Sequence, residues 1–343
     1  MKETTAPGRP AASAGRTART HHDRLRRRVT TAADQAGVAG ALVVLVLVFA
    51  ATAPYFLTVD NLLDVARQIS VTAILGAGLT FVIMTAGIDL SVGSAVGVTA
   101  LFAVRPALDG FPPAIAVLAA LGAGLVIGTV NGVLVARLKL ASFIVTLAAL
   151  TYLRGVTYVG TDGKTLFSTT LGYAWIGNGT VLGVPVPVVI MVLVFAAGWY
   201  LLNRTVFGRW VHAVGGNEEA ARLAGIPVRR VLTCVYIISG LCAGIGGVIA
   251  SARLQSAVPD LGTGYELSAI AAVVLGGTSL MGGKGSLVGT LVGAAIIGVL
   301  VNGMTLLDVS SFYQQIIQGV VIVLAVAVDR LRVREAPAPG AAA

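Results

Sequence analysis

Long apolar runs separated by short polar stretches fill most of the chain. A run of about 20 apolar residues is long enough to cross a bilayer as a helix. Apolar runs of this length or somewhat shorter cover residues 38–57, 69–86, 91–104, 114–136, 143–159, 184–202, 232–252, 267–280, 287–301 and 316–328. The pattern predicts an all-α, polytopic membrane protein with about ten transmembrane helices, some of them short or broken.

The third run indicates a broken helix. It follows the segment GIDLSVG at 87–93, and its residues 91–104 are few for a hydrocarbon core about 30 Å thick. Irregular backbone at membrane depth is tolerated only inside protein or beside a water-filled cavity. We therefore expect this break to lie partly inside the protein.

Small residues recur on one face of two runs, which favours close packing between helices in lipid. The spacing of four is made by Gly124, Gly128 and Gly132, and again by Gly285, Gly289 and Gly293. We expect each face to pack closely against a neighbouring helix.

Composition and charge agree with a membrane protein. The chain is 56% hydrophobic and 11% charged, with a mean hydropathy of +0.90. With the N-terminus inside, the inner segments hold eight Lys and Arg in 1–36, two in 137–139, five in 203–230, Lys284, and three in 330–334, of 24 in total. Cytoplasmic segments are enriched in these residues. The count predicts a multi-pass protein of the cell membrane with both termini cytoplasmic, and it explains the net charge of +9 without a nucleic-acid partner.

The chain divides into three predicted parts. Residues 1–36 have no apolar period and are expected to form a disordered basic cytoplasmic arm. Residues 37–330 form one transmembrane domain, and residues 331–343 form a cytoplasmic tail. The basic run of the arm either rests on anionic lipid or serves only as a topology signal.

A charged segment at 207–231, FGRWVHAVGGNEEAARLAGIPVRRV, interrupts the apolar runs. Asn217 can cap a short helix there, with Glu218 at its positive end and Gly225 at its termination. Glu218 can pair with Arg222, four residues later. Such a helix is either a contact for a soluble partner or an ordinary interfacial loop helix.

Polar residues inside apolar runs are costly and point to a path for solute. The candidates for such a path are Asp89, Ser91, Asn131, Glu266, Asn302 and Gln314. Each has a structural alternative. Asp89 either faces a water-filled cavity or caps the helix that starts near Ser91. The alternative for Glu266 is a helix-start carboxylate, and the alternative for the two asparagines is a hydrogen bond to a neighbouring helix.

Two arginines and a set of glutamines are further polar residues in or near the apolar runs. Arg154 and Arg253 are expected to extend to the outer interface. Gln314, Gln315 and Gln318 either bond the hydroxyls of a sugar or hold neighbouring helices.

Chemistry that needs a cofactor is not expected. The segment GGTSLMGGKGS resembles a phosphate-binding loop, but Thr278 and Gly285 stand where that pattern needs Gly and Ser or Thr. We find no metal-ligand cluster and no nucleophile–base pair in the runs. The chain is therefore expected not to be an enzyme, and ATP would have to be used by a partner chain.

Four stretches resemble the permease subunits of bacterial ABC importers for ribose, xylose and related simple sugars. They are TFVIMTAGIDLSVGS (80–94), NGVLVARLKLASFIVTLAALTYLRG (131–155), FGRWVHAVGGNEEAARLAGI (207–226) and GYELSAIAAVVLGGTSLMGGKGSLVGTLVGA (264–294). The likeness covers about residues 55–330. Ala86 and Ala141 depart from it, where the family often has Gly and Pro.

The resemblance implies the ABC importer permease fold and a coupling helix at about 215–227 that docks on an ATPase subunit. The residues matched to that helix are Asn217, Glu218, Glu219, Ala220, Ala221, Arg222, Leu223, Gly225 and Ile226. It also implies a second permease copy, hence a homodimer in the lipid bilayer, and an extracytoplasmic sugar-binding protein.

The function expected from these observations is translocation of a monosaccharide, ribose-like or xylose-like, driven by ATP hydrolysis in a partner subunit. The alternative is a secondary transporter or facilitative channel for a small polar solute. Few acidic residues lie in the apolar runs, which makes a proton-coupled transporter the less attractive alternative.

Overall fold

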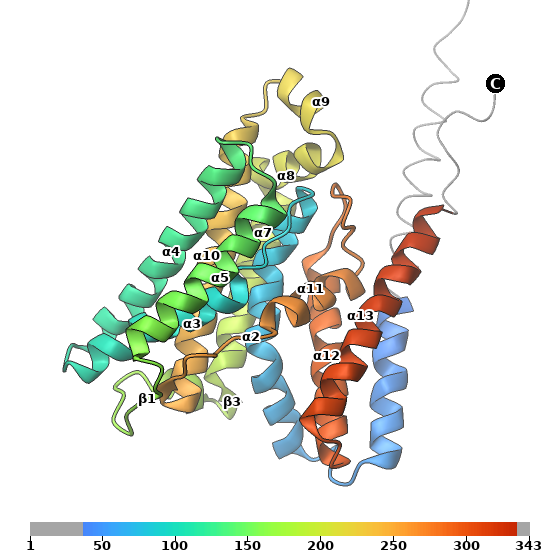
Figure 1. Ribbon diagram of the computed structural model, residues 1–343. Helices are drawn as coiled ribbons and strands as arrows, with labels where there is room; N and C mark the ends of the chain where they lie inside the picture. The colour runs from blue at the N-terminus through green and yellow to red at the C-terminus, as the bar shows by residue number, and fades with distance from the viewer. Residues whose placement is uncertain (1–36, 335–343) are drawn as a thin grey trace, which may run out of the picture.

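The computed structural model describes residues 37–334, which form a bundle of helices with two very small sheets (Figure 1). The helices are Gly37–Thr52, α2 (Val59–Met84), α3 (Val92–Leu108), α4 (Pro113–Ala136), α5 (Ser142–Thr161), α6 (Trp175–Asn178), α7 (Val186–Arg204), α8 (Val206–Gly216), α9 (Glu218–Leu223), α10 (Val228–Leu254), α11 (Tyr265–Leu275), α12 (Leu287–Leu306) and α13 (Ser311–Arg334). Strand β1 (Leu166–Phe167) pairs antiparallel with β4 (Ser256–Ala257), and β2 (Thr180–Val181) with β3 (Val184–Pro185).

The predicted fold class is confirmed, and every predicted run lies largely in a helix. Within the described residues, six helices are long and apolar enough to cross a membrane: α2, α4, α5, α7, α10 and α12. Four apolar helices are shorter, namely Gly37–Thr52, α3, α11 and the Ser311–Leu324 part of α13. The predicted number of about ten membrane helices is therefore only roughly right.

Several boundaries differ from the predicted runs, and local caps decide two of them. Helix α2 begins well before residue 69, since the Thr58 hydroxyl accepts a bond from the Asn61 N–H at 3.4 Å and Asp60 lies in the first turn. Helix α11 ends at Leu275 rather than near residue 280, since Gly277 takes a φ of +83°.

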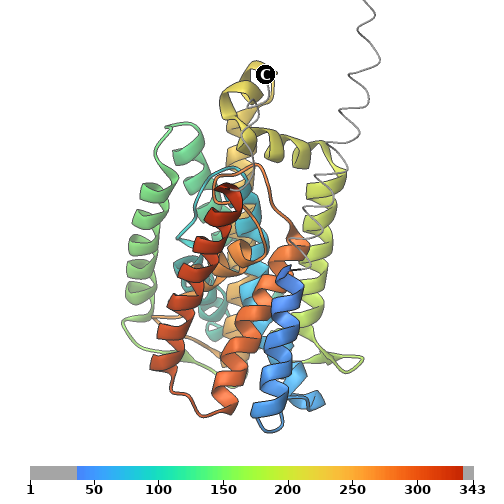
Figure 2. The same ribbon diagram turned by 90° about the vertical axis from the view of Figure 1, so that its right-hand side faces the viewer.

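Helix α2 lies at the centre of the bundle. In its most apolar stretch 83% of the residues are buried, against 28% for each of α4, α5 and α7. Helix α10 packs against α2, α3 and α4. The less buried helices line the outside of the bundle (Figures 1 and 2), where their exposed apolar side chains suit a lipid environment.

The predicted glycine faces make close helix contacts. A Cβ atom on Gly128 of α4 would lie 2.9 Å from the Cα atom of Ile237 in α10. One on Gly293 of α12 would lie 2.9 Å from the backbone nitrogen of Gly276, at the end of α11. Since no side chain fits between these backbones, both close packings are confirmed.

Helices α3 and α11 begin beside each other inside the bundle. A Cβ atom on Gly93 would lie 2.5 Å from the carbonyl oxygen of Gly262 and 3.1 Å from the Cδ atom of Glu266. Gly262 and Gly264 both take φ values near +80°, a conformation that glycine adopts without strain. The chain can thus turn sharply before α11, and the predicted break before α3 is observed.

The bundle has two distinct ends. One carries α8 and α9, and the other carries β1 and β3 (Figure 1). Near the second end lies the polar segment 161–183, whose sequence predicts an external loop with Tyr173 and Trp175 as interfacial aromatics. Tyr173 is instead fully buried, and its hydroxyl lies 3.2 Å from that of Ser251. Burial raises the pKa of Tyr173 to about 12, so its hydroxyl stays neutral. Trp175 is exposed, as expected.

Two predicted parts fall wholly or partly outside the described residues. The basic arm, 1–36, lies outside them, and so does 335–343 of the predicted tail. Residues 331–334 continue α13 as its last turn.

Candidate functional site

The charged segment forms two helices at one end of the bundle. Helix α8 runs across that end, and α9 projects beyond it (Figure 2). The predicted cap is confirmed, since the Asn217 Oδ1 atom accepts a bond from the Ala220 N–H at 2.9 Å. Glu218 and Glu219 are exposed in the first turn, where the helix dipole favours negative charge.

The ion pair on α9 differs from the predicted one. Arg222 bonds the carboxylate of Glu219, with Nη2 at 2.7 Å from Oε2, and not that of Glu218. Positions three apart are neighbours on a helix as well as positions four apart. Both side chains are largely exposed, so the pair contributes little stability.

Helix α9 offers most of its surface to solvent. Leu223 is 80% exposed, and Ala221 is the buried residue of the helix. Ile226 is half-buried beyond the turn at Gly225, whose φ is +81°. Helix α9 thus presents one apolar side chain together with charged side chains at its surface.

A second cluster lies at the break between α2 and α3. The Asp89 Oδ1 atom accepts bonds from the Ser91 N–H at 3.0 Å and from the Ser91 hydroxyl at 2.6 Å. Its Oδ2 atom accepts a bond from the Ser239 hydroxyl of α10 at 2.8 Å. The Ser91 oxygen in turn accepts a bond from the Asn131 amide of α4 at 2.9 Å. All four residues are buried.

The structure therefore brings Asp89, Ser91 and Asn131 together, but as a sealed cluster. The N-cap position of α3 is held by Ser91, which makes no side-chain cap bond, so the predicted alternative of Asp89 as the cap is not observed. Asp89 instead accepts a bond from the N–H of Ser91 itself. Its bonds tie the break to α4 and α10. Such a network of buried hydrogen bonds holds the break in place.

Glu266 lies in the first turn of α11. Its Oε1 atom accepts a bond from the Gly264 N–H at 3.2 Å, which is the predicted alternative of a helix-start carboxylate. Its Oε2 atom is buried without a hydrogen-bond partner. Both broken helices thus carry a carboxylate at their starts.

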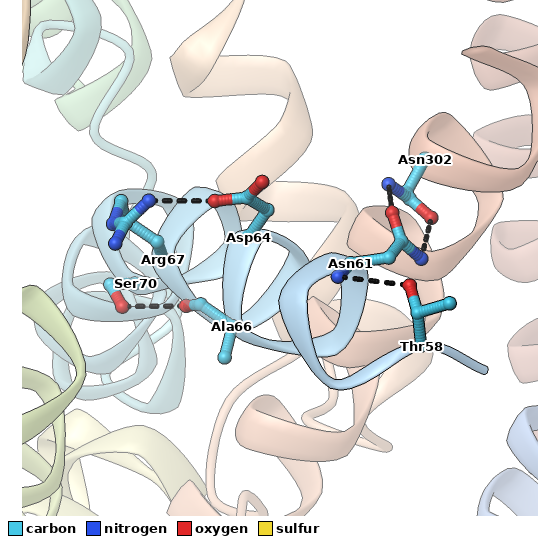
Figure 3. A network of polar contacts seen from close by, with 7 residues as sticks. All are labelled: Thr58, Asn61, Asp64, Ala66, Arg67, Ser70 and Asn302. Carbon is cyan, nitrogen blue, oxygen red and sulfur yellow. Dashed lines mark hydrogen bonds and ion pairs between the residues drawn. The ribbon is translucent and has the colours of Figure 1, made fainter. Parts of the chain in front are cut away.

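The last two predicted residues connect helices at the opposite end of the bundle from α9. Asn302 of α12 and Asn61 of α2 exchange two amide bonds, at 2.9 and 3.1 Å (Figure 3). Gln314 of α13 donates to the Val309 carbonyl at 2.9 Å and to the Thr305 hydroxyl at 3.2 Å. These amides hold the turn between α12 and α13 and the start of α2.

A cavity of about 790 Å³ lies between α2, α10, α11, α12 and α13, toward the end opposite α9. Its polar lining residues are Arg67, Gln68, Thr72, Asn178, Arg253, Thr263, Tyr265, Ser268, Gln315 and Gln318. Donors and acceptors of this kind suit a neutral polyhydroxylated molecule. Of the predicted glutamines, Gln315 and Gln318 reach the cavity and Gln314 does not.

Both charged groups of the cavity lining are cations. Arg67 pairs with Asp64 at 2.6 Å (Figure 3), and its Nε atom is buried without a partner. Arg253, at the end of α10, forms no hydrogen bond or ion pair with residues 37–334. It lines the cavity, whereas sequence reasoning placed it at the outer interface. Arg154 likewise turns inward, to the Leu261 carbonyl at 2.8 Å.

Sequence reasoning missed the cavity residues on α2, Arg67 and Gln68. One signal in the sequence could have found Arg67. A cation close to an apolar run, such as Arg67 or Arg253, is costly in a membrane and therefore points to a function. The grouping of these residues arises only when α2 meets α10 and α13, so spacing along the chain does not reveal it.

Comparison with known proteins gives concordant matches. Residues 61–326 match the family described as branched-chain amino acid transport system / permease component. The ribose import permease protein RbsC of Escherichia coli K12 is 51% identical over 293 residues, covering 84% of this chain and 91% of that protein. The ribose import permease protein RbsC of Bacillus subtilis is 46% identical, covering 84% of this chain and 90% of that protein.

A more distant relative is the D-allose transport system permease protein AlsC of Escherichia coli K12, at 39% identity, with 87% of this chain and 92% of that protein covered. No solved structure matches the chain.

Replacing Asp89 tests whether the sealed cluster is structural. Asp89→Ala removes the acceptor for three donors, so we expect it to lower the stability of the purified protein by about 1–3 kcal/mol. Ser239→Ala removes one of those donors and is expected to cost less. Thermal unfolding in detergent measures both. An Asp89→Ala protein as stable as the wild type would contradict the assignment.

Proposed function

The chain belongs to the branched-chain amino acid transport system / permease component family, and from that membership we propose that it is the membrane-spanning subunit of an ATP-driven importer of a simple sugar. The observation that carries this proposal is the 51% identity to a ribose import permease over 84% of the chain. The relatives with allose and xylose in their names support a monosaccharide as solute. Ribose is the first candidate.

ATP hydrolysis is assigned to a partner chain. Thr278 and Gly285 replace the residues that a phosphate-binding loop requires. In the structure these residues lie in and beside the turn between α11 and α12, whereas such a loop should connect a strand to a helix. The permease then needs no cofactor of its own.

Helix α9 is proposed as the docking element for that ATPase. It projects from the bundle and exposes Leu223 together with its charged residues. The segments at this end also hold Arg137, Lys139 and Lys284, which supports a cytoplasmic position for it. The N- and C-termini are then cytoplasmic as well.

The cavity is proposed as part of the solute path, open toward the extracytoplasmic binding protein. Its amides and guanidinium groups lie between membrane helices, where contact with hydrocarbon would be costly. Gln315 on α13 is exposed beside the apolar Phe312 and Ile316. A second copy of the chain packed on this face would shield these polar groups, which supports a homodimer.

Reconstituted uptake tests the function as a whole. The permease, the ATPase and the binding protein of the same system are placed in vesicles with radiolabelled ribose. We expect uptake that requires ATP and both partners and persists when an ionophore collapses the ion gradients. Uptake by the permease alone, or its loss on addition of the ionophore, would favour a channel or secondary transporter instead.

Charge reversal on α9 tests docking. Glu218→Lys combined with Glu219→Lys places positive charge at the start of the helix, so we expect the ATPase to be lost from the purified complex and uptake to fall with it. The control is Asp162→Lys, an exposed acid at the opposite end. Normal ATPase recovery with the double variant would contradict the docking role.

Removing the charge of Arg253 tests the cavity. A hydrogen bond to a charged group contributes about 1.5–3 kcal/mol, so Arg253→Gln is expected to reduce solute uptake about tenfold while the complex still assembles. Arg105→Gln, which removes an exposed arginine outside the cavity, is the matched control. Equal uptake by both variants would exclude Arg253 from the solute path.

A further inference from the structure

Three chain segments meet backbone to backbone directly beneath α9. They are the end of α2, the end of α8, and the turn between α11 and α12. We call this contact the glycine joint and define it by Met84, Ala86, His212, Gly215, Gly282 and Gly283. None of these residues belongs to α9 or lines the cavity.

Gly215 is the centre of the joint. A Cβ atom at this position would meet the carbonyl oxygen of Met84 and lie 2.6 Å from the backbone nitrogen of Gly283. That nitrogen donates a hydrogen bond to the same Met84 carbonyl at 2.9 Å. Helices α2 and α8 and the turn are therefore in contact without any side chain between them.

The turn contributes two further contacts. Gly282 and Gly283 take φ values of +82° and +75°, which favour glycine. A Cβ atom on Gly282 would lie 2.7 Å from the carbonyl oxygen of Gly215 and 3.0 Å from the Cβ atom of Ala86. A bond from the Ser279 N–H to the Lys284 carbonyl at 3.0 Å closes the turn.

His212 provides the side-chain contact of the joint. Its Nδ1 atom lies 3.1 Å from the carbonyl oxygen of Gly283. Because a carbonyl oxygen only accepts, Nδ1 is the protonated nitrogen of the ring. Helix α8 thus holds the turn by a hydrogen bond as well as by backbone packing.

The joint lies between the docking helix and the cavity. Glu218, the first residue of α9, follows Gly215 after only two residues. Helix α2 reaches the joint at Met84 and lines the cavity with Thr72. Helix α11 leads into the turn and lines the cavity with Ser268. Helix α2 is therefore held at one end by α8, α11 is connected to α8 through the turn, and both helices border the cavity.

We propose that the glycine joint transmits movement of α9 to α2 and α11 and so changes the shape of the cavity. This inference rests on the proposed function, since it requires an ATPase that moves α9. Closely packed backbones transmit displacement because there is no flexible side chain between them to absorb it. Gly215 and His212 are positioning residues in this scheme.

A one-methyl substitution with a matched neighbour tests the joint in the complete reconstituted importer. Gly215→Ala introduces a methyl group against Met84 and Gly283, whereas a Cβ atom on Gly216 meets nothing within 4 Å. We expect the importer with Gly215→Ala to keep its ATPase subunit and to hydrolyse ATP. The amount of ribose taken up per ATP should fall by at least about fivefold, the lower end of common coupling effects. Gly216→Ala should match the wild type.

A second variant covers the possibility that Gly215→Ala does not fold. His212→Ala removes one hydrogen bond from a half-buried residue, and we expect it to lower uptake per ATP as well. His212→Asn, which keeps an N–H donor, should restore part of the loss. Unchanged uptake per ATP in every folded variant would overturn the proposal.

Labelling of the cavity provides a readout that a merely structural defect would not change. Ser268→Cys is made in a Cys234→Ser background, because Cys234 is an exposed native thiol. We expect ATP to change the labelling rate of the introduced thiol in the otherwise wild-type importer. With His212→Ala, ATP should no longer change that rate. If the proposed function itself is wrong, the importer with an intact joint shows no ATP-dependent uptake. That result differs from failure of the joint proposal, in which uptake depends on ATP but is unchanged by the joint variants.

Discussion

Two helices begin inside the bundle, and the rest of the structure depends on how their starts are stabilised. The first N–H groups of any helix lack partners within it, and at membrane depth there is no bulk water to supply them. Asp89 accepts bonds at the start of α3, and Glu266 accepts one at the start of α11. The bonds from Ser239 and Asn131 then fix the first start to α10 and α4. The three helices α3, α4 and α10 are thus joined around the first break.

This constraint explains which parts of the site could be predicted from the sequence. The fold class, the close glycine faces and the Asn217 cap depend on neighbours a few residues apart, and the structure confirms them. The sequence does not decide between the two alternatives for Asp89, because its hydrogen-bond partner Ser239 is far away in the sequence. Tyr173 was placed wrongly for the same reason, since Ser251 is not visible from the loop. The cavity could not be predicted, because separate helices contribute its walls.

The polar residues between the helices separate into two groups by whether they have hydrogen-bond partners. Asp89, Ser91 and Asn302 have partners on other helices or at a helix start, which makes their contribution structural. Arg253 is different, because it has no partner within the described residues and borders a cavity. An uncompensated cation is expensive in such a place. The cost is understandable if the partner is a solute whose hydroxyls occupy the cavity for part of the transport cycle.

Helix α2 borders the cavity and also reaches the contact with α8, and this arrangement limits how the parts can move. A helix rises about 1.5 Å per residue, so the stretch of α2 from Thr72 to Met84 separates the two regions by roughly 18 Å. Over that distance a helix behaves as a rigid rod, and a small rotation at one end becomes a lateral shift at the other. A central helix pinned near its end, beside two interrupted ones, is therefore an arrangement in which a small displacement of α9 can alter the cavity.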